Sequence, residues 1–245
     1  MREHDSDTVS GRTVNAVKTI GLLGGMSWES SALYYQLINE GVRDRAGGFH
    51  SAPCLMSSVD FALVEEMQTR GAWDEAGQLL AREASGLESI GAECIVLCTN
   101  TMHKVADAIT GAISVPMLNV IDVTAEAIRE AGVETVALLG TRFTMEEPFY
   151  RERMAGHGII TLAPSGADER VVNDVIYGEL VHGVIHDESR AAYREVIGRL
   201  VEQGAEGVIL GCTEIELLVG PEDCSVPVFP STRLHAQAAV EFALR

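Results

Sequence analysis

A ten-residue segment of this chain occurs twice, and this repeat restricts the folds that the sequence can adopt. Residues 91–100 (GAECIVLCTN) match residues 204–213 (GAEGVILGCT) at an offset of 113. Each copy runs from a Gly turn through an apolar stretch into small polar residues, which is typical of a strand buried on both faces. Open α/β sheets bind their ligands at the carboxyl ends of such strands. In this register Cys212 corresponds to Thr99 rather than to Cys98.

Two further pairs of segments support a duplicated architecture. Residues 18–24 match residues 134–140 at an offset of 116, and residues 115–118 match residues 226–229 at an offset of 111. Buried parallel strands resemble one another in composition, but three pairs in the same order favour a duplication over that explanation. We therefore expect an α/β fold of two pseudo-symmetric, flavodoxin-like parallel-sheet domains, with the site between them.

Composition limits the classes of function open to the chain. With 245 residues, 47% of them hydrophobic, it can bury one large core or two smaller ones. We expect no membrane span, because no apolar run reaches the roughly 18 residues that a span requires. The net charge of −18 argues against nucleic acids and anionic membranes as partners, since both bind basic surfaces. Five cysteines without the spacing of a disulfide framework indicate a reducing, cytoplasmic environment.

Strand and helix patterns alternate along the chain, which predicts parallel sheets covered by helices. Strands are expected at residues 18–23, 53–59, 94–99, 117–120, 135–139, 159–163, 208–212 and 228–230. Helices are expected at residues 29–45, 73–90, 103–109, 123–131, 146–157, 169–182, 189–203 and 232–244. We assign residues 1–17, which are polar, to a disordered leader. The first domain then comprises residues 18–117 and 228–245, and the second comprises residues 118–227.

Cys212 has the most reactive side chain at the predicted strand ends. A cysteine between a strand and a helix meets unpaired backbone N–H groups, which favour its thiolate form. Thr213 and Glu214 follow directly and add a hydroxyl and a carboxylate to the turn. Neighbouring strand residues point to opposite faces, so if Thr99 faces the cleft, Cys98 faces the core. We expect small buried apolar side chains at Cys54, Cys94 and Cys224.

A metal site and a dinucleotide site have weaker support. Cys94, Cys98 and His103 lie within ten residues, but no second ligand pair has zinc spacing, so we expect no metal. The turn at residues 21–27 lacks the G-x-G-x-x-G spacing, and no acidic residue ends a second strand about 20 residues later. The N–H groups of this turn, with the Ser27 hydroxyl, suit a carboxylate at a helix start.

Three motifs resemble those of the aspartate/glutamate racemase family. They are residues 24–26 (GGM), 100–103 (NTMH) and 211–214 (GCTE), and the resemblance extends from Lys18 to the C-terminus. Bacterial amino-acid racemases with the sequences GGMSWES and CTNTMH are similar to this chain over both segments. The resemblance implies two similar α/β domains, no cofactor, and movement of the substrate's α-proton between two cysteines on opposite faces.

Two positions depart from the family pattern. The usual motif is Cys-Asn-Thr-x-His, and Thr99 stands where that cysteine would be, in agreement with the internal repeat. Both lines therefore favour a pair formed by Thr99 and Cys212. The arginine that holds the side-chain carboxylate in many aspartate racemases corresponds to Val64 here, whereas a basic residue near the start of a second-domain helix is retained as Arg170. Of the two basic positions that the resemblance implies for an acidic substrate, this chain therefore keeps only one.

The sequence predicts a cofactor-independent amino-acid racemase for aspartate, glutamate or a related amino acid. Cys212 and Thr99 are the expected catalytic residues. The expected substrate-binding residues are Met26, Ser27, Asn100, Thr101, Arg170 and Thr213. Two alternatives stay open: a single-cysteine relative, such as a decarboxylase or a cis–trans isomerase of small diacids, and a non-catalytic amino-acid-binding module. We also expect a homodimer.

Overall fold

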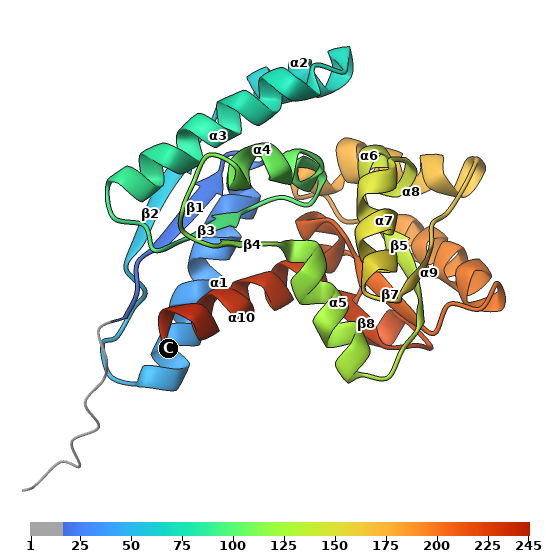
Figure 1. Cartoon of the computed structure of the whole chain (residues 1–245). Helices are drawn as coiled ribbons and strands as arrows, with labels where there is room; N and C mark the ends of the chain where they lie inside the picture. Colours follow the sequence, from blue (N-terminus) through green and yellow to red (C-terminus); the bar gives the residue numbers. More distant parts are fainter. Residues whose placement is uncertain (1–16) are drawn as a thin grey trace, which may run out of the picture.

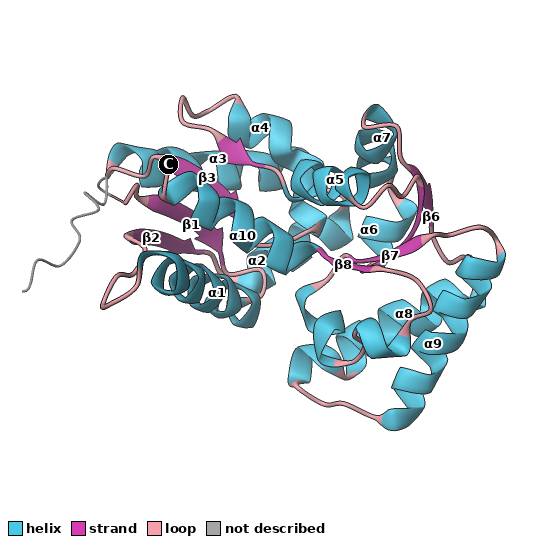
Figure 2. Ribbon diagram, turned by 90° about the horizontal axis from the view of Figure 1, so that it is seen from below, coloured by secondary structure: helices cyan, strands magenta, loops and turns pink. Residues whose placement is uncertain are grey.

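The computed structural model describes residues 17–245 and contains two four-stranded parallel sheets, one in each of two domains that lie side by side (Figure 1). The strand orders are β2-β1-β3-β4 and β6-β5-β7-β8. The two sheets therefore have the same topology, and β1 to β4 correspond to β5 to β8 in turn. Helices cover both faces of each sheet (Figure 2). The predicted α/β fold of two similar parallel-sheet domains is confirmed. The expected leader, residues 1–17, lies outside the described residues except for Val17.

The strands follow the repeat closely. The first domain holds β1 (Ile20–Gly24), β2 (Cys54–Ser58), β3 (Cys94–Leu97) and β4 (Met117–Leu118). The second domain holds β5 (Thr135–Leu139), β6 (Ile160–Leu162), β7 (Gly207–Leu210) and β8 (Val228–Pro230). In both sheets the first and third strands of the domain form the central pair: β1 pairs with β3, and β5 pairs with β7. The two copies of the ten-residue repeat therefore occupy equivalent central positions.

Ten α-helices and four short 3₁₀ helices connect the described strands. The first-domain connections are α1 (Trp28–Ala46), α2 (Phe61–Arg70), α3 (Trp73–Ser89), η1 (Thr101–Val105) and α4 (Ala106–Thr110). The remainder are α5 (Val120–Glu130), α6 (Arg142–Glu146), α7 (Pro148–Gly156), α8 (Ala167–Gly178), η2 (Leu180–His182), α9 (Asp187–Glu202), η3 (Thr213–Leu217), η4 (Pro221–Asp223) and α10 (Ser231–Ala243).

Two local features differ from the sequence-based expectation. The single helix expected at residues 146–157 is broken, because Pro148 has no N–H to donate and holds Glu147 extended, at ψ 143°. Helix α2 was not predicted, although Asp60 caps it by accepting a hydrogen bond from the Ala62 N–H at 3.1 Å. This helix matters for function because it forms part of the wall of the site.

Side chains of β3 alternate between two separate hydrophobic cores. Cys94 and Val96 pack on the side of α1 and α10, whereas Ile95 and Leu97 pack on the side of α3 and α4. Cys98 continues the first set and is fully buried. The alternation is the two-residue period of an extended strand, and it persists one residue beyond Leu97.

The chain crosses between the domains at two places, and these differ from the expected boundaries. Leu118 pairs with Val96, so the first sheet extends one residue further than expected. Residues 228–230 were assigned to the first domain, but β8 pairs with β7 and so completes the second sheet. Only α10 then returns to the first domain, where it packs against α1, while its other side contacts α5 (Figure 1). The β8 strand is short and apolar, and its sequence alone does not distinguish one sheet from the other.

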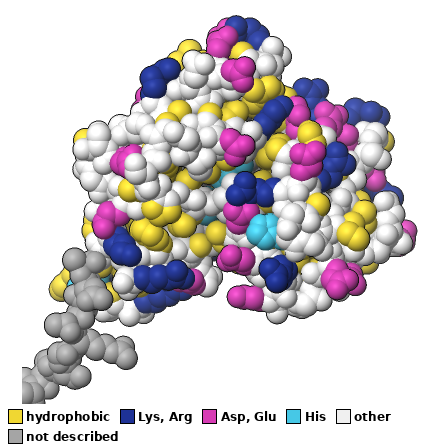
Figure 3. Space-filling model, viewed as in Figure 1, with side chains coloured by type: hydrophobic (Ala, Val, Ile, Leu, Met, Phe, Trp, Pro, Cys, Tyr) yellow, Lys and Arg dark blue, Asp and Glu magenta, His cyan; other side chains and the backbone are white. Residues whose placement is uncertain are grey.

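The described surface mixes charges of both signs. On the face seen in Figure 3, Lys and Arg side chains are interspersed with Asp and Glu. Within residues 17–245, no helix combines the length and apolar character needed to cross a bilayer.

Gly25 gives a test of how tightly the turn after β1 is packed. Its φ is +93°, and a Cβ at this position would overlap the backbone of Val59. We expect Gly25→Ala to lower the free energy of unfolding by about 2 kcal/mol or more. Gly86 is the matched control, because it is exposed on α3 with open space around it, and Gly86→Ala should stabilise by roughly 0.5–1 kcal/mol. Equal effects in urea unfolding would contradict the packing argument.

Candidate active site

A cavity lies between the domains, where the carboxyl ends of both sheets face each other. Residues that follow β1, β3, β5 and β7 line it, together with side chains from α2, α8, η2 and α10. The space between its walls is about 580 Å³ when the open solvent at its mouth is included. Its position is the one at which open parallel sheets bind ligands.

Thr99 and Cys212 both line this cavity. Thr99 follows β3, Cys212 follows β7, and those two strands occupy equivalent places in their sheets. Each side chain is partly buried. The internal repeat therefore brings a hydroxyl from one domain and a thiol from the other to a single cavity.

Cys98 lies outside the cavity. Its N–H donates to the Leu23 carbonyl at 2.9 Å, which extends the pairing of β3 with β1 by one residue. Its thiol is fully buried, with Sγ 3.6 Å from the Val96 carbonyl, and burial raises its pKa far above the ordinary range. The Thr99 N–H then donates to the Leu97 carbonyl at 2.9 Å, and this tight turn carries Thr99 to the cavity.

The Cys212 thiol is held by a carboxylate. Its Sγ donates to Glu214 Oε2 at 3.0 Å, and the same oxygen accepts a hydrogen bond from Thr213 Oγ1 at 2.8 Å. Burial, the charge of Glu214 and this hydrogen bond raise the pKa of Cys212 well above its usual value. The N–H groups of Thr213 and Glu214 act in the opposite direction but more weakly. The expectation that the turn favours a thiolate is therefore wrong for this arrangement, in which Cys212 is a protonated thiol.

Glu214 also links the two domains across the cavity. It is 9% exposed, and its Oε1 accepts a hydrogen bond from Ser27 Oγ of the first domain at 3.2 Å. Ser27 is also the N-cap of α1, where its Oγ accepts from the Ser30 N–H at 3.2 Å. Glu214 follows Cys212 in the sequence, but its contact with both the thiol and Ser27 becomes visible only once the domains are placed.

The start of α1 forms one wall of the cavity. Met26, Ser27 and Ser30 line it, and the Ser30 hydroxyl donates to the Cys98 carbonyl at 3.0 Å. The positive end of the helix dipole thus faces the cavity. Gly24 approaches Ser31 so closely that a side chain there would collide with it, which fixes the helix against the end of β1.

Asn100 and Thr101 connect the cavity floor to the second domain. Asn100 Nδ2 donates to Ser231 Oγ at 3.1 Å, while its buried Oδ1 has no partner. Thr101 Oγ1 lies 3.0 Å from Thr141 Oγ1 and 3.3 Å from Thr144 Oγ1, in a buried cluster of three hydroxyls. Asn100 therefore lines the cavity and keeps one buried acceptor without a partner, whereas the Thr101 hydroxyl is already engaged.

Two buried histidines lie beneath the floor and face away from the cavity. His103 Nδ1 is 2.8 Å from the Thr99 carbonyl, and its Nε2 accepts from the Val120 N–H at 3.1 Å. His235 Nε2 is 2.8 Å from the Leu118 carbonyl, and its Nδ1 is 2.9 Å from the Tyr34 hydroxyl. Burial lowers the pKa of His103 to about 3 and that of His235 to about 4, so both are neutral.

Arg170 is not at the cavity. It is exposed on α8, and the side chains that α8 presents to the cavity are Ile176 and Tyr177. Val64 is fully buried in the first-domain core. Sequence reasoning missed several lining residues that come from helices rather than strand ends, namely Phe61, Gln68, Ile176, Tyr177, Val181 and Thr232. No local motif marks them, because their position depends on how the helices fold over the cavity.

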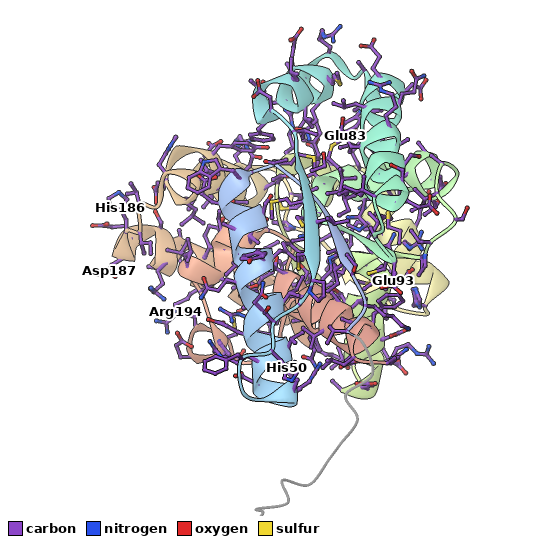
Figure 4. The ribbon with its side chains drawn as sticks, turned by 90° about the vertical axis from the view of Figure 1, so that its left-hand side faces the viewer. His50, Glu83, Glu93, His186, Asp187 and Arg194 are labelled. Atoms are coloured by element: carbon purple, nitrogen blue, oxygen red, sulfur yellow. The ribbon has the colours of Figure 1, made fainter. Side chains whose placement is uncertain are left out.

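The described residues contain no group of three or more His, Cys, Asp or Glu side chains arranged to hold a metal. His50 and His186 lie at the periphery of the molecule (Figure 4) and are exposed. The lining side chains that can exchange a proton carry the thiol of Cys212, the carboxylate of Glu214, and several hydroxyls.

Comparison with known proteins agrees with the fold described above. The Asp/Glu/Hydantoin racemase family matches residues 23–239. A crystal structure named as a "putative Asp/Glu racemase" from Yersinia pestis is 51% identical, with a TM-score of 0.89 over 93% of this chain and 100% of the other. An aspartate racemase homologue from Pyrococcus horikoshii is 33% identical, with a TM-score of 0.83 over 93% of this chain and 100% of the other.

A further relative is the broad specificity amino-acid racemase RacX of Bacillus subtilis. It is 25% identical over 167 residues, which is 68% of this chain and 72% of RacX. The fold is that of its two-domain racemase relatives, and the family match covers most of the chain. The chain belongs to the Asp/Glu/Hydantoin racemase family.

Because the two buried histidines are neutral in the folded protein, we expect the free energy of unfolding to fall in weak acid. Their pKa values are lower in the folded protein than the ordinary 6.5, so the unfolded chain binds more protons below about pH 6.5. Stability should fall as pH drops from 6.5 towards 4, by up to about 1.4 kcal/mol per pH unit for each histidine. Urea unfolding between pH 7.5 and 5 should show a shallower pH slope for His235→Asn than for the parent. His50→Asn, at an exposed position, should keep the parent slope; equal slopes for all three proteins would contradict the assignment.

Proposed function

We propose that this protein is a cofactor-independent amino-acid racemase that uses Cys212 and Thr99 on opposite sides of the substrate. The observation that carries the proposal is that these two residues end equivalent strands and line one cavity. Membership of the racemase family supports a reaction at the α-carbon of an amino acid. The similarity to a broad specificity amino-acid racemase supports a substrate range beyond one amino acid.

Proton removal begins with the contact between Cys212 and Glu214. The thiol gives its proton to the Glu214 carboxylate along the 3.0 Å hydrogen bond, and the resulting thiolate takes the α-proton. Burial raises the pKa of the thiol, so the thiolate is a stronger base than an ordinary cysteine thiolate. A strong base suits this step, because the α-proton of an amino acid is very weakly acidic.

The negative charge that develops on the substrate needs donors at the α-carboxylate. The start of α1, with Ser27, and the N–H groups of the turns after β3 and β7 surround one region of the cavity. Donors held in place before the reaction stabilise charge as it develops. The unpartnered Oδ1 of Asn100 is an acceptor for the substrate's ammonium group.

Thr99 completes inversion from the opposite side. Its hydroxyl returns a proton to the carbanion and then regains one from water, while Glu214 releases to solvent the proton that it took from Cys212. A hydroxyl is a poor base at neutral pH because its pKa is far above that of a thiol, so proton removal from the Thr99 side is slow. We therefore propose that the two enantiomers differ in their saturation behaviour and in α-proton exchange with solvent, while kcat/KM for inversion is equal in the two directions because the equilibrium constant is one.

A second candidate function has support from the same feature. A single thiol at the cavity is also the arrangement expected of a relative that decarboxylates or isomerises small diacids. Racemisation requires exchange of the α-proton with solvent in an amino acid, whereas those reactions do not. Deuterium uptake at the α-carbon of L-amino acids, followed by NMR, distinguishes the two, and ligand binding without any exchange indicates a binding module.

Substitution of the proposed base should abolish most of the activity. In Cys212→Ser the hydroxyl is almost never ionised at neutral pH, and we expect racemisation to fall at least about a hundredfold. Glu214→Gln removes the proton acceptor and leaves the thiol intact; kcat should fall, whereas the labelling rate of Cys212 by a thiol reagent should rise because the pKa of the thiol is lower without the carboxylate. The readout is circular dichroism of L- and D-substrate. Full activity in Cys212→Ser would exclude Cys212 as the base.

A second set of variants separates Thr99 from Cys98. Cys98→Ala should keep racemisation within a few-fold of the parent and lose a little stability through a small cavity. Thr99→Ala should stop inversion while Cys212 still exchanges the α-proton of one enantiomer. Thr99→Cys should supply a second thiol and make both enantiomers good substrates. Deuterium uptake and circular dichroism give the two readouts; loss of turnover in Cys98→Ala but not in Thr99→Ala would reverse the assignment.

A further inference from the structure

The cavity walls carry no basic side chain among the described residues. Of the side chains that line it, Cys212, Tyr177 and Glu214 are those that titrate, and each is either neutral or negative. The described side chains of the cavity therefore present a carboxylate, that of Glu214, and no cation. The partly positive group that faces the cavity is the start of α1.

The basic residues next to the lining residues are held elsewhere. Three cations closely follow lining residues in the sequence: Lys104 is three positions after Thr101, Arg142 is next to Thr141, and Arg233 is next to Thr232. Each forms an ion pair instead: Lys104 with Glu147 at 2.8 Å, Arg142 with Glu146 at 3.8 Å, and Arg233 with Glu216 at 2.5 Å. Lys104 also lies 4.0 Å above the ring of Trp73. None of these three cations is presented to the cavity.

The polar and apolar lining residues come from different elements. Strand-end turns and the start of α1 supply hydroxyls, amides and N–H groups. The helices that fold over the cavity supply mainly apolar groups, from Phe61 on α2, Ile176 on α8 and Val181 on η2. The α-carboxylate and ammonium groups of an amino acid match the first set, which places its side chain against the second.

A second carboxylate would find few partners on the helical wall. The polar groups there are the Tyr177 hydroxyl, the Thr232 hydroxyl, and the Gln68 amide, which already donates to Met102 Sδ at 3.0 Å. Burial, followed by the effects of Cys212, Glu65 and Glu214, raises the pKa of the Tyr177 hydroxyl to about 12, and Arg142 acts more weakly in the opposite direction. A carboxylate placed there would meet like charges and lose its hydration without an ion pair.

We propose that this enzyme acts on amino acids with uncharged side chains and discriminates against aspartate and glutamate. The inference rests on the proposed racemase function and specifies its substrate class. It is carried by the absence of a lining cation within residues 17–245, the charge of Glu214 and the apolar residues of α2, α8 and η2. The expected substrates have a neutral side chain of moderate size, whether amide or aliphatic.

Isosteric pairs of amino acids test the proposal directly. L-asparagine and L-aspartate differ chiefly in the charge of the side chain, as do L-glutamine and L-glutamate. We expect kcat/KM for α-proton exchange to be at least about tenfold higher for the amide in each pair, because the site leaves the extra charge unpaired. L-leucine and L-methionine extend the comparison to apolar side chains of similar length.

A variant that adds a cation to the helical wall should reverse this preference. Phe61→Arg places a guanidinium at the cavity, and the ratio of acid to amide turnover should rise at least about tenfold. Phe61→Met is the matched control without charge and should keep the parent ratio. Arg142→Ala and Arg170→Ala report on cations outside the cavity, and both should leave the ratio unchanged. Circular dichroism and unfolding curves check that each variant is folded.

The outcomes separate failure of this inference from failure of the proposed function. Absence of α-proton exchange with every amino acid would overturn the racemase function itself. Exchange that depends on Cys212 but shows an amide-to-acid ratio below about tenfold would overturn only the substrate class. Selective loss of aspartate turnover in Arg142→Ala or Arg170→Ala would do the same, since it would identify a cation that reaches the bound substrate. The parent ratios decide the matter even if Phe61→Arg fails to fold.

Discussion

The hydrogen bonds that join the two domains beneath the cavity are the constraint on which the site depends. Asn100 Nδ2 donates to Ser231 Oγ, which in turn donates to the Leu210 carbonyl at 2.8 Å. These buried contacts tie the turn after β3 to the end of β7. Because an unpaired buried polar group is costly, they hold the domains in a narrow range of separations. The distance between Thr99 and Cys212 is set by this network rather than by either residue.

Much of the fold and part of the site follow from the sequence because a parallel strand carries a simple signal. The apolar stretches before Thr99 and Cys212 identify central strands, and the constant offset gives their equivalence without any structure. The separation of Cys98 from Thr99 rests on the two-residue period of β3, which the packing of Cys94, Val96 and Cys98 in one core shows directly. Local periodicity is thus enough to assign a face.

Other features depend on contacts that local sequence does not encode. Arg170 has the expected residue type, but the face of α8 that meets the cavity is the one with Ile176 and Tyr177. The pKa of Cys212 was expected to fall because of N–H groups in its turn, and it rises because burial and the neighbouring Glu214 outweigh those groups. In both cases the surroundings made by folding outweigh a general rule about helix starts.

The charge of Glu214 connects the proposed base strength of the enzyme to its proposed substrate class. A cation in the cavity would hold a substrate's second carboxylate, but it would also attract Glu214 and lower the pKa of the Cys212 thiol. A thiolate of lower pKa is more abundant but is a weaker base toward the α-proton. The ammonium group of the substrate supplies the positive charge that balances Glu214 once the substrate is bound. A site built on Cys212 and Glu214 therefore favours one carboxylate and one ammonium group in the ligand, and it does so through the same electrostatic field that makes Cys212 a strong base.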